Sequence, residues 1–254
     1  EICACLVGSE MCIRDSDTTD APVETDEPEP TVDPHDVGEK LAEFNPTGTV
    51  EETVLFDNEI SKITLKSLEY TDYEAIFNLS IENKTDGELD YSCGSVGYCV
   101  NSVNGYMVSE GFMNCQVPAN TTQDESFDMS FYSLKQYGIF EIADFEIGFS
   151  ITDEEYNKTY TGPLAVKTSI ADGYDYSKHS FANTAATQAA QNTYHYNIDY
   201  FAADELYNEG GIRLVTEVLY TNDENEQYLM LEFENNSDIC LLYTSPSPRD
   251  MRRS

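Results

Sequence analysis

Two stretches of alternating apolar and polar residues, far apart in the chain, constrain its fold most. Tyr73–Asp86 reads YEAIFNLSIENKTD, and Gln227–Asp238 reads QYLMLEFENNSD. Apolar side chains fall at every second position, namely Phe77, Leu79 and Ile81, then Leu229, Leu231 and Phe233. This period of two predicts half-buried β-strands, and the polar ENKTD and ENNSD that follow are typical of turns. The sequence therefore predicts one strand-and-turn unit written twice, about 152 residues apart.

The two ends of the chain have an unusual relation at the level of codons. Val7–Ser16 can be back-translated into a DNA whose reverse complement reads, in one frame, as Cys240–Asp250. Natural chain ends have no reason to encode each other's complementary strand. We expect residues 1–16 and 240–254 to be a translated sequencing-library adapter, as in a metagenomic fragment, and set them aside from fold reasoning.

A net charge of −35 limits the possible partners, and the tails do not alter it because they hold four basic and four acidic residues. Such a charge repels phosphate backbones and anionic lipid, so no nucleic-acid binding is expected. Self-repulsion that keeps a secreted protein soluble explains the charge, with binding of cations or basic partners as the alternative. No apolar run approaches the roughly 18 residues of a transmembrane helix, so no such span is expected in this chain.

Cysteine and histidine usage gives no metal or disulfide framework. Three cysteines lie outside the tails, at Cys93, Cys99 and Cys115. This odd number predicts thiols, and one disulfide bridge among the three remains possible. Three histidines, at His35, His179 and His195, are too widely spaced for a zinc motif.

Residues 17–48 are rich in acidic residues and proline, with few side chains that can be buried. We expect a disordered spacer, either between a membrane anchor and a surface domain or between two domains. Val37–Phe44 is expected to form a short helical turn at its end.

Residues 49–168 predict an antiparallel β-sandwich, because short alternating segments recur with turns about every ten residues. Expected strands cover 54–56, 60–70, 73–83, 99–103, 106–109, 114–117, 127–131, 145–151, 158–161 and 163–168. Asn104-Gly105 predicts a tight hairpin turn, and Ser133–Gly138 predicts a helical turn closed by glycine.

Residues 169–204 are expected to be a linker, with a weak helix around Asn183–Gln191 and a strand at Tyr194–Phe201. Residues 205–239 are expected to be a truncated second copy of the sandwich that does not fold independently. Its first strand keeps one parity through Ile212, Leu214, Val218 and Tyr220. In the first copy the apolar residues change from odd to even positions along this strand, and a β-bulge near Ser67 is predicted to bring both sets to the same face.

The stretches VLFDNEISKITLKSLEY, NLSIENKTD, SVNGYMV, ANTTQDESFDMSF and TGPLAVKT, behind an acidic spacer, resemble the immunoglobulin-like domains of unknown function in cell-surface lipoproteins of Gram-positive bacteria. The resemblance covers Val54–Thr168 and part of Glu205–Asp238. It implies a surface-exposed sandwich, often in tandem, and carries no catalytic residues to transfer. The anchoring cysteine of such lipoproteins would lie upstream of Asp17, and none of Cys3, Cys5 and Cys12 is that cysteine.

No constellation in the sequence indicates catalysis. Cys93–Gly97 lacks the spacing of a nucleophile elbow, and all three histidines lie outside the predicted sandwich. The acidic turns Asp153–Glu155 and Asn222–Glu226 match no calcium-loop pattern and are expected to be ordinary turns. Tyrosines in the strand patterns are expected to pack against neighbours rather than bind sugars, namely Tyr70, Tyr98, Tyr106 and Tyr160. Asn-x-Ser/Thr sequons matter only in a eukaryotic secretory host.

We therefore expect an extracellular, non-catalytic immunoglobulin-like module of a bacterial surface lipoprotein, with a binding, adhesion or spacer role and no cofactor or metal. Its partner would be an extracellular protein or a glycan. The alternative is an accessory carbohydrate-binding domain of a larger secreted enzyme.

Overall fold

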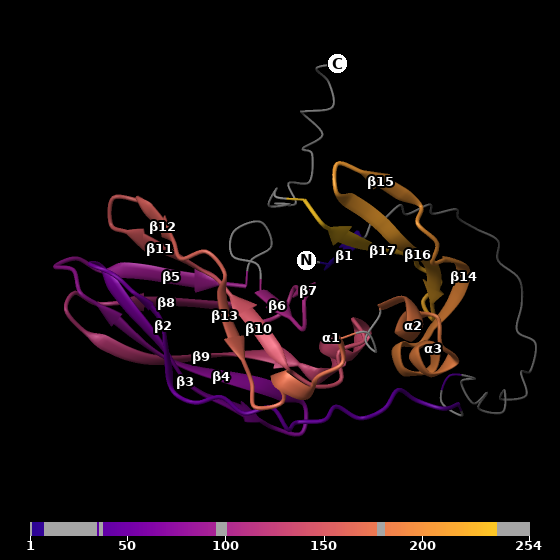
Figure 1. Ribbon diagram of the computed structural model, residues 1–254, viewed down its shortest axis with the longest axis horizontal. Coiled ribbons are helices and arrows are strands. Elements are labelled where there is room, and N and C mark those ends of the chain that lie inside the picture. Colours follow the sequence, from indigo (N-terminus) through magenta and orange to yellow (C-terminus); the bar gives the residue numbers. More distant parts are fainter. Residues whose placement is uncertain (1, 8–34, 36–37, 95–100, 177–180, 238–254) are drawn as a thin grey trace, which may run out of the picture.

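We describe residues 2–7, 35, 38–94, 101–176 and 181–237 of a computed structural model of the chain (Figure 1). The fold is all-β with antiparallel sheets, as the alternating patterns predict. Two four-stranded sheets face each other in the first part of the chain. The first sheet has the order β2 (Thr53–Asp57), β3 (Ser61–Tyr70), β4 (Glu74–Asn83) and β9 (Thr122–Ser130). The second has the order β12 (Lys158–Tyr160), β11 (Phe149–Asp153), β5 (Leu89–Cys93) and β8 (Met113–Val117).

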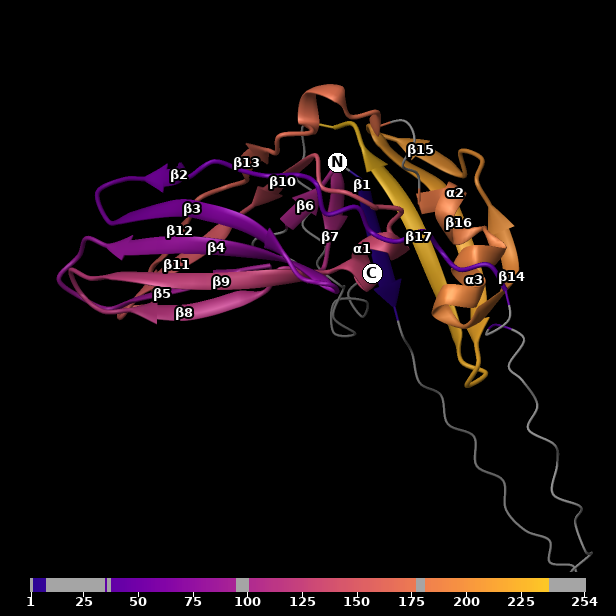
Figure 2. The same ribbon diagram turned by 90° about the horizontal axis from the view of Figure 1, so that it is seen from below.

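A third sheet runs from this sandwich into the C-terminal part of the chain (Figure 2). Its order is β13 (Leu164–Lys167), β10 (Asp144–Ile147), β6 (Asn101–Val103), β7 (Tyr106–Val108), β1 (Ile2–Val7), β17 (Gln227–Asn235), β16 (Ile212–Asn222) and β14 (Tyr196–Ala202), with β15 (Tyr207–Glu209) also on β16. We call β14 to β17 the C-terminal sheet. The described residues also form four short helices, namely α1 (Phe131–Gln136), the 3-10 turn η1 (Ala171–Gly173), α2 (Phe181–Ala185) and α3 (Gln188–Tyr194).

Connections between consecutive strands cross from one sheet of the sandwich to the other. Strands β4 and β5 follow one another in the chain but belong to different sheets, and β9 returns to pair with β4. This arrangement is possible because each strand has one apolar face, which an opposing sheet can cover. The predicted antiparallel sandwich is confirmed.

Phe77 of β4 lies at the centre of the core and is fully buried. Its ring stacks on Phe127 of the neighbouring strand at 4.7 Å and meets Phe145 of β10 edge-on at 4.8 Å. A second link crosses between the sheets, where the Tyr91 hydroxyl donates to the Ser61 hydroxyl at 2.8 Å. The opening stretch of the sequence therefore supplies the side chain that joins both layers.

β-Bulges interrupt both long hairpins. The pairing of β3 with β4 shifts between Leu65 and Ser67, where the sequence predicts it. The pairing of β16 with β17 shifts in the same way between Leu214 and Thr216, which the sequence analysis missed. Since a bulge reverses the side on which later residues point, Leu214 lies on the face opposite Val218 and Tyr220. The expected single parity of this strand is wrong.

Two predicted turns are confirmed by their geometry. Asn104 and Gly105 both have positive φ, at 51° and 83°, and join β6 to β7. Helix α1 is followed by Gly138 with φ of 80°, close to the expected helical turn and its glycine stop.

The helical turn predicted for Val37–Phe44 is wrong for its described part, since residues 38–44 contain no helix. The extended segment spans two distant contacts, because Lys40 Nζ donates to a carbonyl of α3 and Phe44 stacks on Phe131 at 4.1 Å. A helix of the same residues would be too short to make both contacts. Part of the expected spacer is thus packed against the fold.

Residues 169–204 include the predicted helix, as α2 and α3, and the predicted strand, as β14. Ile2–Val7, from the stretch attributed to an adapter, pairs antiparallel with β17 and parallel with β7. This pairing does not bear on the origin of its codons. Residues 8–16 and 240–254 lie outside the described residues.

Phe77→Ala should lower the free energy of unfolding of the sandwich by about 3–5 kcal/mol, because it removes a buried ring and leaves a cavity. Urea unfolding followed by tyrosine fluorescence measures this loss. Tyr73→Ala is the matched control, since Tyr73 is 78% exposed. A loss for Phe77→Ala no larger than that of the control would show that this ring is not central to the core.

Candidate functional site at the junction of the sandwich and the C-terminal sheet

Two of the cysteines singled out in the sequence lie in the sandwich. Cys93 belongs to β5 and Cys115 to β8, and the Cys93 thiol donates to the Gly111 carbonyl at 3.3 Å. Burial, and then the nearby Glu125 and Asp90 carboxylates, raise the pKa of Cys115 to about 12. A thiol with such a pKa is a poor nucleophile at neutral pH. Cys99 lies outside the described residues.

The two acidic turns have the same internal bonding. Asp153 Oδ1 accepts from the backbone N–H groups of Glu155 and Asn157, at 2.9 and 2.8 Å. Asn222 Oδ1 accepts from Glu224 and Glu226 in the same manner, at 3.0 and 2.9 Å. Each first side chain therefore stabilises its own turn.

The tyrosines divide between packed and exposed positions. Tyr106 is buried, and the Tyr70 hydroxyl donates to the Gly48 carbonyl at 2.7 Å, as expected of packed residues. Tyr160 is 52% exposed, so its expected packing is wrong. It belongs to β12, an edge strand with a neighbour on one side only. Tyr98 lies outside the described residues.

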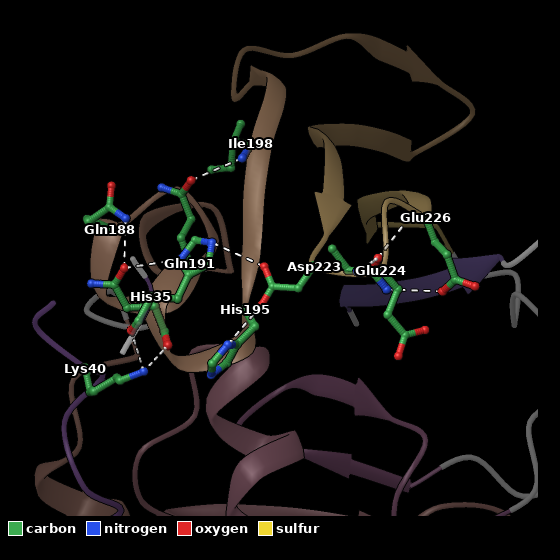
Figure 3. Close-up of polar contacts among 11 residues, drawn as sticks. His35, Lys40, Gln188, Gln191, His195, Ile198, Asp223, Glu224 and Glu226 are labelled. Atoms are coloured by element: carbon green, nitrogen blue, oxygen red, sulfur yellow. Dashed lines mark hydrogen bonds and ion pairs between the residues drawn. The ribbon is translucent and has the colours of Figure 1, made fainter. Parts of the chain in front are cut away.

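Two histidines that are far apart in sequence meet at Asp223 (Figure 3). His35 Nε2 lies 3.5 Å from Asp223 Oδ1, and His195 Nδ1 lies 3.0 Å from Asp223 Oδ2. His35 is buried, and the ring centroids of the two histidines are 5.8 Å apart. Sequence spacing could not reveal this cluster, because it forms only when the β16–β17 turn folds beside the end of α3. His179 lies outside the described residues.

Buried Asn192 on α3 holds the segment before the sandwich in place. Its side-chain amide donates to the Glu39 carbonyl at 2.9 Å, and its Oδ1 accepts from Gln188 at 2.9 Å. Lys40 Nζ donates to the His35 carbonyl at 2.7 Å and also to the Asn192 carbonyl. These bonds attach Glu39 and Lys40 to the C-terminal part of the chain.

Aromatic side chains join α1 to α3 and α3 to the C-terminal sheet. The Tyr194 hydroxyl donates to the Tyr132 carbonyl at 2.7 Å, and the two rings meet edge-on at 4.7 Å. Tyr196 packs against Tyr220 at 4.7 Å, and its hydroxyl donates to the Ala185 carbonyl. Burial raises the pKa of Tyr220 to about 12.

A buried carboxyl group completes the junction. Glu232 of β17 is 4% exposed and accepts from the Thr216 hydroxyl at 2.5 Å and from the Tyr106 hydroxyl of β7 at 3.5 Å. Burial raises the pKa of Glu232, with a smaller contribution from Glu234. Burial also raises the pKa of Tyr106 to about 12. The folded junction therefore favours the protonated form of Glu232.

The described residues do not build a metal site. No three histidine, cysteine or carboxylate side chains among them are grouped so as to hold a metal ion. No helix in the described part of the chain is long and apolar enough to cross a membrane.

No family model matches the chain. No curated protein sequence matches it either.

Millimolar calcium should change the thermal midpoint of unfolding by less than about 1 °C, because the Asp153 oxygens already accept hydrogen bonds from their own turn. Differential scanning fluorimetry with and without calcium measures the shift. A rise of several degrees that disappears in Asp153→Asn would instead place a calcium site in this turn.

Glu232→Gln should change how stability depends on pH. The folded state holds the Glu232 proton more tightly than the unfolded chain does, so the stability that this proton provides is full at acidic pH. It is lost as the pH rises through the raised pKa. The wild type should therefore become less stable relative to Glu232→Gln as the pH rises from about 4, near the pKa of an unfolded glutamate, through the raised pKa.

Urea unfolding across this pH range measures the difference. Glu224→Gln is the control, because Glu224 is an exposed carboxyl in the β16–β17 turn. A constant difference between wild type and Glu232→Gln at all pH values would contradict the assignment of the buried proton.

Proposed function

We propose that the chain is a non-catalytic, extracellular, tandem immunoglobulin-like module of a bacterial surface lipoprotein, with a spacer, adhesion or binding role. The observation that carries this proposal is a correspondence between two sets of paired strands. In the sandwich, Phe56 pairs with Ile63 and Ile63 with Ile81. In the C-terminal sheet, Tyr207 pairs with Leu214 and Leu214 with Phe233.

The correspondence continues along both hairpins, with the bulge after the Leu65–Leu79 pair in the first and before the Glu217–Leu231 pair in the second. Leu65 pairs with Leu79 and Leu68 with Phe77 in the first hairpin. Glu217 pairs with Leu231 and Leu219 with Leu229 at the matching places of the second. A run of matching pairs along both hairpins supports an origin by duplication.

The junction supports a role that depends on a fixed arrangement of units. Asn192, Tyr194 and Glu232 each contact residues from another part of the fold, as described above. Units that are joined by buried polar and aromatic contacts transmit orientation better than units on a flexible linker. A surface spacer or adhesin benefits from such a joint.

One observation supports the alternative, an accessory carbohydrate-binding domain. Tyr156 and Tyr160 belong to the β11–β12 hairpin and are 86% and 52% exposed. Exposed tyrosine rings can provide stacking surfaces for ligands. Two tyrosines on a small edge hairpin make a limited platform, so we retain the surface module as the leading proposal.

Glycan-array binding separates the two proposals. We expect no saturable glycan binding by the chain, and the same result for a Tyr156→Ala/Tyr160→Ala double variant. Glycan binding that is lost in the double variant would favour the carbohydrate-binding alternative. Sequencing the intact gene gives an independent test, since an upstream lipoprotein anchor favours the surface module and an adjoining hydrolase domain favours the alternative.

A further inference from the structure

The sandwich has a cavity at its end, which we call the end cavity. Its volume is about 330 Å³, within the range of small-ligand sites. Residues of the β2–β3 turn, the β4–β5 loop and the β11–β12 hairpin line it. Figure 1 shows this hairpin at the end of the sandwich that points away from the C-terminal sheet. The cavity is therefore separate from the junction, and strands of the sandwich hold the segments around it.

The floor of the end cavity is apolar. Ile60, Leu89 and Ile151 line it from three different segments. Leu89 and Ile151 belong to the hydrophobic core, and Ile60 is half-buried against it. Gly87 keeps the space above them open, since a Cβ there would meet nothing nearer than the Glu154 carboxyl group, at 3.7 Å. Such a floor favours an alkyl chain over water.

The rim of the end cavity is negatively charged. Glu88, Glu154 and Glu155 line it and are exposed. Lys84 and Lys158 flank lining residues in the sequence, but no basic side chain is among the described residues that line the cavity. The net charge of −35 strengthens the same field over the whole chain. Charge complementarity therefore selects a cationic ligand.

The β4–β5 loop is fixed before any ligand binds. The side-chain amide of buried Asn83 donates to the Gly87 carbonyl at 2.8 Å, and its Oδ1 accepts from the Thr85 backbone N–H at 2.8 Å. Glu154 Oε1 accepts from the Glu88 backbone N–H at 3.4 Å, which links the hairpin to this loop. A preformed cavity loses little conformational freedom on binding, so weak contacts suffice for measurable affinity.

The geometry favours an organic cation over a metal ion. The carboxylates among the described residues are not grouped closely enough to hold a metal. Asp153, which also lines the cavity, already accepts three hydrogen bonds from its own turn. Hard metal ions need six or more oxygen ligands, whereas an ammonium group on an alkyl stem matches an apolar floor with a charged rim.

We propose that the end cavity binds a lysine side chain presented by a basic segment of a partner protein. The alkyl stem would lie on Ile60, Leu89 and Ile151. The ammonium group would reach the carboxylates of Glu88 and Glu154. Lysine fits better than arginine, because an ammonium group is a point charge, whereas a guanidinium group is matched by planar bidentate contacts. This proposal does not rest on the proposed surface function, since the sandwich alone forms the cavity.

Titration followed by amide chemical shifts in nuclear magnetic resonance tests the proposal. The probe is the peptide acetyl-Gly-Gly-Lys-Gly-Gly-amide. We expect saturable shifts at Glu88, Leu89 and Ile151, with a roughly millimolar dissociation constant that rises with added salt. The same peptide with norleucine in place of lysine keeps the alkyl stem without the charge and should not bind. Tighter binding of the matching arginine peptide or of calcium at these amides would overturn the proposal.

Variants separate the cavity from the general charge of the chain. Glu88→Gln/Glu154→Gln removes two rim charges and should raise the dissociation constant about tenfold or more. Asp124→Asn/Asp128→Asn removes the same charge from exposed positions of β9 and should leave the constant nearly unchanged. Gly87→Leu fills the cavity at constant charge and should abolish binding. The amide spectrum outside the cavity reports that each variant is folded.

Two results with these variants would overturn the proposal. An equal loss of binding in both double variants would mean that the peptide responds only to net charge. Unchanged binding by folded Gly87→Leu would mean that the peptide binds outside the end cavity.

Discussion

A strand with one apolar face cannot be stable alone, and this constraint organises the whole molecule. Phe77 shows how the sandwich meets it, since one ring contacts Phe127 in its own sheet and Phe145 in the opposing layer. The flanking Leu79 and Ile81 extend the same row beneath that layer. Apolar burial of this kind supplies most of the free energy that offsets the ordering of the chain.

The β16–β17 hairpin meets the constraint differently from the β3–β4 hairpin, because the opposite face of its sheet is the one that is covered. Met230 and Glu232 are buried against the junction, whereas the apolar row at Leu229 and Leu231 stays half-buried. Burying Glu232 costs free energy, since a carboxyl group far from water favours its neutral form. Hydrogen bonds from Thr216 and Tyr106 reduce that cost and tie the two parts of the fold together.

Much of the fold was predictable because alternation and turn chemistry are local signals. The Asn104-Gly105 turn, the bulge before Ser67 and the strand from Tyr196 follow from patterns of a few residues. The bulge at Leu214–Thr216 was not predictable, because apolar residues on both sides of it conceal the change of face. The cluster of His35, His195 and Asp223 was beyond sequence reasoning, since its members are brought together only by tertiary packing.

The pairing of β16 with β17 is the central structural claim, because the apolar row at Leu229 and Leu231, the junction and the likeness to the first hairpin all depend on it. Backbone nuclear Overhauser effects in solution measure this pairing directly. We predict cross-strand contacts that place Leu214 opposite Phe233 and, after the bulge, Glu217 opposite Leu231. Contacts that place Thr216 opposite Leu231 would mean an unbroken ladder without the bulge, and would contradict this account.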